Sequence, residues 1–277
     1  MNIGRVLLVC NPSQPAAEQT ARRLADFLHT RGVGSHILTD YKTIPQHPAD
    51  LCVSLGGDGT TLRCARQTAA QGMNVLAVNC GSLGFLSACE ADEAEECLRQ
   101  ILQGHYEVSR RILLSCDIVR QGKPMLQKQL AFNDCVIKTN QPRAFTLQAR
   151  CNGRELKRFY GDGVIVSTPA GSTAYALAAG GPIVEPDLQV LLLTPICPHS
   201  LTQRPLLLQA DARLEFTPLF KNDAETAVVS LDGQESFELH AGDRVAVRRS
   251  PYWAQLICGG RFDFFGRLRR KLEWGER

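Results

Sequence analysis

The chain has 277 residues, of which 44% are hydrophobic and 21% are charged, and its net charge is +3. These values are typical of a globular protein with one large domain or two ordinary ones, and so small a net charge excludes a broad basic surface for nucleic acid. The sequence also has no run of about 20 apolar residues that could cross a membrane. We therefore expect neither a nucleic acid nor a membrane among its partners.

The cysteines and histidines do not follow a metal-binding pattern. Eleven cysteines are present, an odd number, none of them form Cys-x-x-Cys pairs, and the six histidines are scattered. Most of the cysteines stand inside apolar runs, which predicts reduced, buried thiols in a cytoplasmic protein. The sequence therefore identifies no metal ligands.

The first hundred residues alternate between strand-type and helix-type segments. Strands are expected at residues 3–10, 35–39, 51–55 and 74–79, and helices at residues 15–31, 61–70 and 92–103. This alternation predicts a parallel, doubly wound α/β domain over residues 1–105. In such sheets ligands bind at the carboxyl ends of the strands.

A glycine-rich turn, Gly56-Gly57-Asp58-Gly59-Thr60, joins the third strand to the helix that follows it. Glycine is needed where φ is positive or where the backbone approaches a ligand, and a helix N-terminus suits phosphate. Gly56, Gly57, Gly59 and Thr60 are therefore candidates for a phosphate loop. Asp58 would repel phosphate, so it needs a separate reason: a metal, a ribose hydroxyl or a proton to remove. The alternative is a tight turn in which Asp58 caps the helix.

The pattern changes near residue 106, where short β-type runs begin. They are expected at residues 112–119, 130–139, 145–150, 163–167, 190–193, 206–208, 227–231 and 244–247, with one helix at 172–179. Turn signals, among them Asn152-Gly153 and Asp232-Gly233, separate these runs, so residues 106–250 are predicted to form an antiparallel β domain. Residues 251–277 form a C-terminal segment, in which the basic amphipathic stretch 261–273 is expected to be a packed helix with a solvated basic face.

A second glycine-rich stretch covers residues 161–183, beginning with Gly161-Asp162-Gly163. Its strand ends in Ser-Thr-Pro and is followed by a Gly-Ser-Thr turn and a helix of small residues. Four hydroxyl groups of this stretch could bond a heterocycle or a phosphate; they belong to Ser167, Thr168, Ser172 and Thr173. The alternative is a tightly packed turn in which the hydroxyls bond the backbone.

Together these stretches resemble the bacterial-type NAD kinases, which use ATP to phosphorylate the adenosine 2′-hydroxyl of NAD and give NADP. Four stretches carry the resemblance, in the order of that family: Gly56–Thr60, Asn133-Asp134, residues 161–183 and Asp232-Gly233-Gln234. The segment 195–205 also resembles a loop of the family. The resemblance implies an α/β domain, a β-sandwich domain and a C-terminal segment that returns to the first domain.

The resemblance also implies roles for individual residues. Asp58 would be the general base, and Asn133 and Asp134 would bind the dinucleotide around its adenosine ribose. The adenine side would be lined by Thr173, Ala174, Tyr175, Ala176, Leu177 and Ala178. Gly59 would lie beside the dinucleotide, and weaker matches suggest the same for Gln234, Arg63 and Arg143. NAD and ATP would be the substrates, with Mg²⁺ expected on ATP.

Two further matches lie at the start of the second motif. Asp162 would contact dinucleotide bound mainly to a neighbouring subunit, which implies a homo-oligomer, a dimer or a tetramer. Tyr160 stands where the family often has a basic residue, and we expect it to favour NAD over NADH. The chain also departs from the usual pattern at Asp134, where the family has Glu, and at Ala170, where it has Thr.

Two other functions have to be weighed. A diacylglycerol- or sphingosine-type lipid kinase shares the first glycine motif, but the chain has no amphipathic membrane-docking segment and it carries the second motif. A non-catalytic NAD(P)-binding regulator would not gain from Asp58, because an anion beside the phosphates weakens binding.

Overall fold

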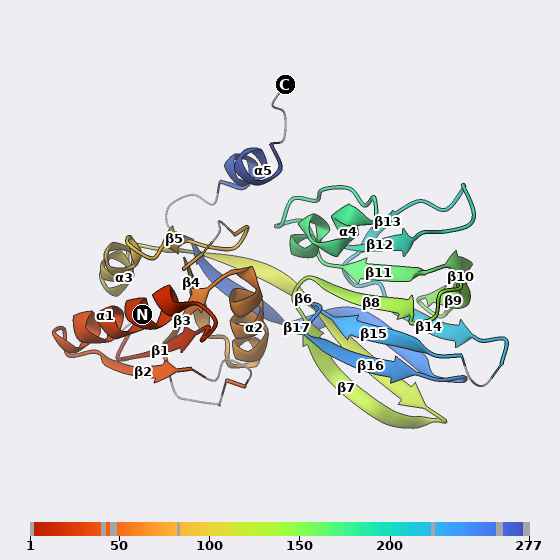
Figure 1. Ribbon diagram of the computed structural model, residues 1–277, viewed down its shortest axis with the longest axis horizontal. Coiled ribbons are helices and arrows are strands. Elements are labelled where there is room, and N and C mark those ends of the chain that lie inside the picture. Colours follow the sequence, from red (N-terminus) through yellow and green to blue (C-terminus); the bar gives the residue numbers. More distant parts are fainter. Residues whose placement is uncertain are drawn as a thin grey trace. The chain divides into compact units, whose positions relative to one another are not determined.

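The computed structural model describes residues 3–39, 43–44, 49–81, 84–222, 225–258 and 263–273. The chain divides into two compact units, which we describe separately. The first combines Met1–Arg111 with Tyr252–Arg277, and the second is Ile112–Pro251. Figure 1 labels the elements of both units.

The first unit contains a parallel sheet (Figure 1). Its strands are β1 (Arg5–Cys10), β2 (Gly34–Leu38), β3 (Leu51–Gly56), β4 (Asn74–Asn79), β5 (Cys89–Glu90) and the last part of β17 (Arg244–Cys258). The order is β17-β4-β3-β1-β2, with β5 beside the end of β4. Every residue of β3 and β4 is buried, which fits central strands covered on both faces.

Helices cover both faces of this sheet. The helices of this part of the unit are α1 (Pro15–His29), α2 (Asp58–Thr68) and α3 (Ala94–Leu102), with a 3₁₀ turn at Ala69–Gln71. The apolar sides of α1 and α3 share one core with Val6, Leu8 and Val53. The alternate residue Ser54 points to the other face, where its hydroxyl bonds that of Thr61 on α2 at 3.0 Å. The sheet is therefore doubly wound, as expected.

The strand order places the glycine turn at a switch point of the sheet. From β1 the chain passes through α1 to β2 on one side, and β3 then lies on the other side of β1. The loops after β1 and β3 thus diverge, and this is where open α/β sheets bind ligands. The N–H of Asn11 bonds the carbonyl of Leu55 at 3.0 Å, so the two strand ends stay together there.

The second unit contains two antiparallel sheets. One has the order β10-β9-β14-β17-β6-β7, formed by β6 (Glu107–Arg120), β7 (Lys123–Ala131), β9 (Phe145–Cys151), β10 (Arg154–Gly161), β14 (Leu214–Leu219) and the first part of β17. The other has the order β13-β12-β11-β8-β15-β16, formed by β8 (Asp134–Thr139), β11 (Gly163–Ser167), β12 (Val190–Ile196), β13 (Leu206–Gln209), β15 (Ala227–Leu231) and β16 (Glu235–Leu239). The buried thiols of Cys116 on β6 and Cys135 on β8 lie 3.9 Å apart, so the sheets meet in the core.

Several predicted elements differ from the observed ones. The expected strand at residues 130–139 is two strands, β7 and β8, separated by Phe132-Asn133. The expected helix at 172–179 is only a 3₁₀ turn, Ala170–Thr173, and a single α-helical turn, α4 (Tyr175–Ala178). Its glycines and alanines permit close packing but give a short helix little stability of its own. The C-terminal helix α5 (Phe264–Leu272) begins at Phe264, because Asp263 is its N-cap. Residues 261 and 262 of the expected helix lie outside the described part of the chain.

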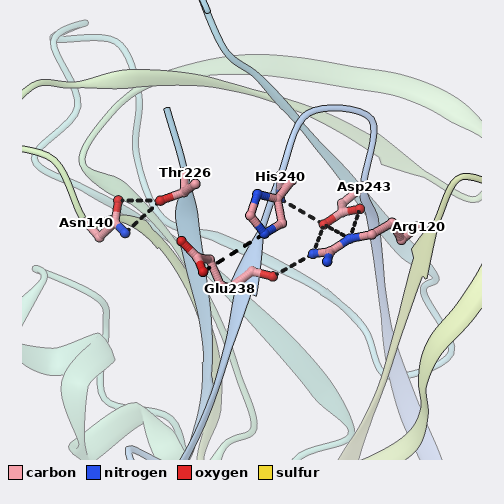
Figure 2. Close-up of polar contacts among 6 residues, drawn as sticks. All are labelled: Arg120, Asn140, Thr226, Glu238, His240 and Asp243. Atoms are coloured by element: carbon pink, nitrogen blue, oxygen red, sulfur yellow. Dashed lines mark hydrogen bonds and ion pairs between the residues drawn. The ribbon is translucent and has the colours of Figure 1, made fainter. Parts of the chain in front are cut away.

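An ion pair between a partly exposed arginine and a buried carboxylate fixes a corner of the second unit (Figure 2). The guanidinium of Arg120 donates to both oxygens of Asp243, with the shortest distance 2.8 Å, and to the carbonyl of Glu238 at 2.9 Å. The same carboxylate accepts the backbone N–H of His240 at 2.8 Å. The side chain of Asp243 is fully buried. This pair therefore ties the end of β6 to the turn between β16 and β17.

Candidate active site

The glycine turn holds Asp58 at the first position of α2. The residue before it, Gly57, is the N-cap, and no side chain caps this helix end. The carboxylate of Asp58 instead accepts the N–H of Phe85 at 2.8 Å on Oδ2 and that of Leu86 at 3.1 Å on Oδ1. The structure thus excludes the cap reading, since Asp58 bonds a separate loop and not its own helix.

The glycines around Asp58 serve different purposes. A Cβ on Gly56 would lie 2.5 Å from the hydroxyl of Thr60, so this glycine is needed for packing. A Cβ on Gly84 would lie 2.8 Å from Cγ of Asp58, so this glycine leaves room for the carboxylate. Gly57 is extended, with φ −97° and ψ −171°, and a Cβ there would meet no described atom within 4 Å. Neither packing nor conformation requires Gly57, which leaves an open approach to the N-terminus of α2.

In the second unit, Asn133 and Asp134 lie in a segment that is held from two sides. The carboxylate of Asp232 accepts the N–H groups of Phe132, Asn133 and Asp134 at 2.9, 2.7 and 3.2 Å. On the other side, the N–H of Thr168 bonds the carbonyl of Asn133 at 2.9 Å, and the Thr168 hydroxyl bonds the carbonyl of Phe132 at 2.7 Å. The Asn133-Asp134 and Asp232-Gly233-Gln234 stretches therefore meet beside Thr168, within the glycine-rich stretch 161–183.

This segment borders a cavity of about 410 Å³, which is within the usual size range for small-molecule sites. It is lined by Asn133, Asp134, Val136, Lys138, Ala174, Tyr175, Val228, Ser230, Asp232, Gly233 and Ser236. Tyr175 exposes 40% of its surface, so its ring is available to a flat ligand. Burial, and secondarily the Asp232 carboxylate, raises the pKa of Asp134 to about 7. Asp134 can thus either donate or accept a hydrogen bond near neutral pH.

Three of the four hydroxyls singled out in the stretch 161–183 bond the protein backbone. Ser172 donates to the carbonyl of Pro169 at 2.7 Å and accepts the N–H of Val184 at 3.0 Å, and Thr173 bonds the carbonyl of Ala170 at 3.3 Å. Ser167, Thr168 and Ser172 are buried. The hydroxyls of Thr168, Ser172 and Thr173 therefore bond the backbone and build the turn, whereas the buried Ser167 hydroxyl has no hydrogen-bond partner among the described residues. Gly171 is required there, because a Cβ would lie 2.6 Å from the carbonyl carbon of Asn133.

The remaining predicted residues lie elsewhere. Of the six expected to line the adenine side, Ala174 and Tyr175 border the cavity, whereas Thr173, Ala176, Leu177 and Ala178 do not. Gln234 lies in the turn between β15 and β16, and its N–H bonds the carbonyl of Leu231 at 2.9 Å. Gly59 and Arg63 are on α2. Arg143 borders a different cavity of about 320 Å³, beside Phe145 and Phe220.

Tyr160 and Asp162 are exposed at the end of β10. The ring of Tyr160 lies 4.7 Å from that of His199, at an interplanar angle of 52°. The backbone of Asp162 bonds Thr139 and Ile196 at 2.9 and 3.0 Å. Neither side chain borders the Asp134 cavity.

Comparison with known protein families assigns both units. Residues 37–106 match the model of the ATP-NAD kinase N-terminal domain, and residues 132–258 match that of the ATP-NAD kinase C-terminal domain. The chain belongs to the ATP-NAD kinase family. It is 38% identical to the NAD kinase of Citrifermentans bemidjiense over 99% of both chains, and 43% identical to that of Geobacter metallireducens over 83% of this chain and 80% of the relative.

Solved structures of NAD kinases share the fold. Yeast NADH kinase complexed with NADH has a TM-score of 0.90 and 25% identity, covering 100% of this chain and 89% of the yeast chain. The NAD kinase of Archaeoglobus fulgidus in complex with ATP has a TM-score of 0.80 and 26% identity, covering 96% and 98%. The expected fold and family are confirmed, and neither the lipid kinase nor the regulator is supported by these similarities.

Sequence reasoning missed three parts of this ATP-NAD kinase site. Asp232 was expected as part of the Asp232-Gly233-Gln234 motif without a role of its own, although its carboxylate holds the Asn133–Asp134 segment. Gly84 leaves room for the Asp58 carboxylate, and the N–H groups of Phe85 and Leu86 bond it. The sequence of a loop does not indicate which distant side chain its glycine or its backbone N–H groups contact. A cluster of glycines after a neighbouring strand of the same sheet, at residues 81 and 84, was the available clue.

Three general properties concern metals, membranes and disulfides. Within the part of the chain that the structure describes, no three His, Cys, Asp or Glu side chains are grouped so that they could hold a metal ion. No helix among the described residues is long and apolar enough to span a bilayer. All eleven cysteines are free thiols.

Proposed function

We propose that this ATP-NAD kinase transfers the γ-phosphoryl group of ATP to the adenosine 2′-hydroxyl of NAD and gives NADP, with Asp58 as the general base. The supporting observation is the environment of Asp58. Its carboxylate does not cap its own helix, and two loop N–H groups hold it beside the open Gly57. A carboxylate fixed next to a helix N-terminus is placed to accept a proton from a group that reacts with phosphate.

The chemistry needs a base and neutralisation of phosphate charge. Asp58 accepts the proton of the 2′-hydroxyl while that oxygen forms its bond to the γ-phosphorus and the bond from the γ-phosphorus to the β,γ-bridging oxygen breaks, which releases ADP. The N-terminus of α2 supplies N–H donors and positive dipole potential for phosphate oxygens, and Gly57 leaves them room. Phosphoryl transfer depends mainly on such positioning and electrostatics.

The Asp134 cavity supplies the groups for the dinucleotide. Asn133 and Asp134 would bond the adenosine ribose, and the exposed ring of Tyr175 would contact the adenine. Lys138, which borders the same cavity, adds a positive charge for phosphate oxygens. Asp162 would reach the dinucleotide of a neighbouring subunit, and the active form would then be a homo-oligomer.

The divalent metal belongs with the nucleotide in this proposal. Mg²⁺ is commonly bound through substrate phosphates and one or two carboxylates, without a complete protein cage. We therefore treat MgATP as the substrate.

The test is a coupled assay for NADP formation from NAD, ATP and Mg²⁺. A parallel reaction offers diacylglycerol in place of NAD, with labelled ATP in both reactions. The proposal expects label in NADP and none in lipid. Transfer to the lipid alone, or binding of NAD without turnover under any of these conditions, would contradict it.

A further inference from the structure

The loop that holds Asp58 is itself held by a side chain from the other end of the chain. Arg267 of α5 donates from Nη1 to the carbonyl of Phe85 and from Nη2 to the carbonyl of Ser87, the second at 2.6 Å. The ammonium of Lys271 lies 5.3 Å from the centre of the Phe85 ring. The loop thus turns its N–H groups toward Asp58 and its carbonyls toward α5.

The position of Arg267 along α5 is fixed by packing and by a cap. The carboxylate of Asp263 accepts the N–H of Gly266 at 2.8 Å and starts the helix. A Cβ on Gly266 would lie 2.6 Å from Cγ of Asp263, so the cap needs this glycine. Phe264 and Leu268 are buried on either side of Arg267. These contacts determine which side chain of the helix meets the loop.

The charge of Arg267 also suits this place. Burial lowers the pKa of its guanidinium, and the neighbouring Asp58 acts in the opposite direction. An arginine stays protonated at neutral pH even so. A partly buried cation is costly unless its donors are satisfied, and the carbonyls of Phe85 and Ser87 satisfy two of them. The guanidinium is therefore held against the loop by these two hydrogen bonds, and it fixes the position of the two carbonyls in return.

We propose that Arg267 is a positioning residue for phosphoryl transfer: it fixes the loop at residues 85–87, whose N–H groups orient the Asp58 carboxylate. The proposal rests on the proposed function, because it gives Asp58 the role of base. Arg267 acts only through the loop. Its loss should lower kcat and leave the binding of both substrates largely unchanged, since the nucleotide groups stay in place.

The test compares five variants in the NADP assay with saturating MgATP. Arg267→Ala removes both donors, and Arg267→Lys keeps the charge but not the two-pronged geometry. Arg269→Ala is the matched control, because it removes the same charge from an exposed position of the same helix. The double variant Asp58→Asn/Arg267→Ala is compared with Asp58→Asn alone. This comparison tests whether the two residues act as one unit.

A base displaced by about 1 Å loses roughly a hundredfold in rate. We therefore expect kcat to fall about a hundredfold in Arg267→Ala and about tenfold in Arg267→Lys, with KM values within twofold of the parent and with Arg269→Ala unchanged. Adding Arg267→Ala to Asp58→Asn should lower the rate no further. If Arg267→Ala does not fold, Arg267→Lys and its double variant carry the same comparison.

Three results would overturn the inference: a kcat within twofold of the parent in Arg267→Lys and Arg267→Ala, losses confined to KM, or losses that add fully to that of Asp58→Asn. These outcomes are distinct from a failure of the proposed function. If the proposed function is wrong, Asp58→Asn itself will retain the parental kcat, whatever the kcat of the Arg267 variants.

Discussion

Gly84 offers a way to move the Asp58 carboxylate without changing its chemistry. In Gly84→Ala the new Cβ would lie 2.8 Å from Cγ of Asp58, whereas ordinary carbon contacts are about 3.5–4.0 Å. The carboxylate or the loop must therefore move by about 1 Å. A displacement of that size costs roughly a hundredfold in rate, and overpacking costs about 1–3 kcal/mol of stability. We expect kcat to fall about a hundredfold while the KM values for NAD and ATP stay within about twofold.

Gly81→Ala is the matched control for this prediction. It adds the same methyl group to the same segment, but the nearest atom to its Cβ is the amide nitrogen of the Gln14 side chain at 3.2 Å, a flexible group that can yield. The measurement is steady-state kinetics of NADP formation for the parent and both variants, with thermal unfolding to show that each is folded. A folded Gly84→Ala enzyme with parental kcat would refute the reasoning, because Asp58 could then move without consequence.

Three further predictions concern the second unit. Burial raises the pKa of Asp134 from 3.8 to about 7, so between these pH values the folded state keeps a proton that the unfolded state loses. The free energy of unfolding should therefore fall as pH rises from about 4 to 7, by up to about 4 kcal/mol. Urea titrations should show a flatter pH dependence in Asp134→Asn. Arg120→Ala leaves the fully buried Asp243 carboxylate without its cation and should cost about 3–5 kcal/mol of stability; a loss below about 1 kcal/mol in chemical denaturation would show that the pair is dispensable. Tyr160 should favour NAD over NADH by a few-fold to roughly thirtyfold, because a cation over an aromatic face gains about 0.5–2 kcal/mol; equal kcat/KM values for the two dinucleotides in the parent, or an unchanged ratio in Tyr160→Gly, would remove this argument.

The regular parts of the fold could be predicted from local sequence. The strand at Asn74–Asn79 and those at Gly163–Ser167 and Ala227–Leu231 have the bounds expected from their apolar runs. The turn at Asp232-Gly233 was also predicted, and both residues have positive φ, 54° and 64°. These features are encoded within a few residues, so periodicity and turn chemistry suffice to find them.

Other elements could not be predicted because their sequences lack a clear apolar pattern. The strand β10 has the exposed polar residues of a sheet edge, including Arg154, Glu155 and Lys157. The strand β14 has a proline in its short run, and in β16 only the last residue is buried. The early start of α2 at Asp58 was hidden by the glycines before it. Tertiary packing decides such segments, and local propensity does not.

The chemistry of the site was predictable at the level of motifs and not at the level of contacts. Asp58 stood out because a carboxylate in a phosphate-type turn needs an explanation. Phe85 and Leu86, which hold it through backbone N–H groups, lie 27 and 28 residues further along the chain. Arg267, which bonds their loop, lies 182 residues after Phe85. Every residue except proline has a backbone N–H, so the sequence does not show which N–H groups bond Asp58. A basic C-terminal helix is common, so its sequence does not point to Arg267. The roles of the individual site residues stay predictions.

The most direct test of the account is to remove the base and keep the shape. Asp58→Asn should lower kcat for NADP formation by about 10²–10⁴ while NAD binding, measured by calorimetry, changes little. Asp50→Asn is the matched control, because the Asp50 carboxylate also accepts two backbone N–H groups, from Gly4 and Arg5 at 2.8 and 2.9 Å, outside the glycine turn. We predict near-parental turnover in Asp50→Asn and a severe loss in Asp58→Asn. Near-parental turnover in a folded Asp58→Asn enzyme would contradict the central claim that Asp58 accepts the proton of the 2′-hydroxyl.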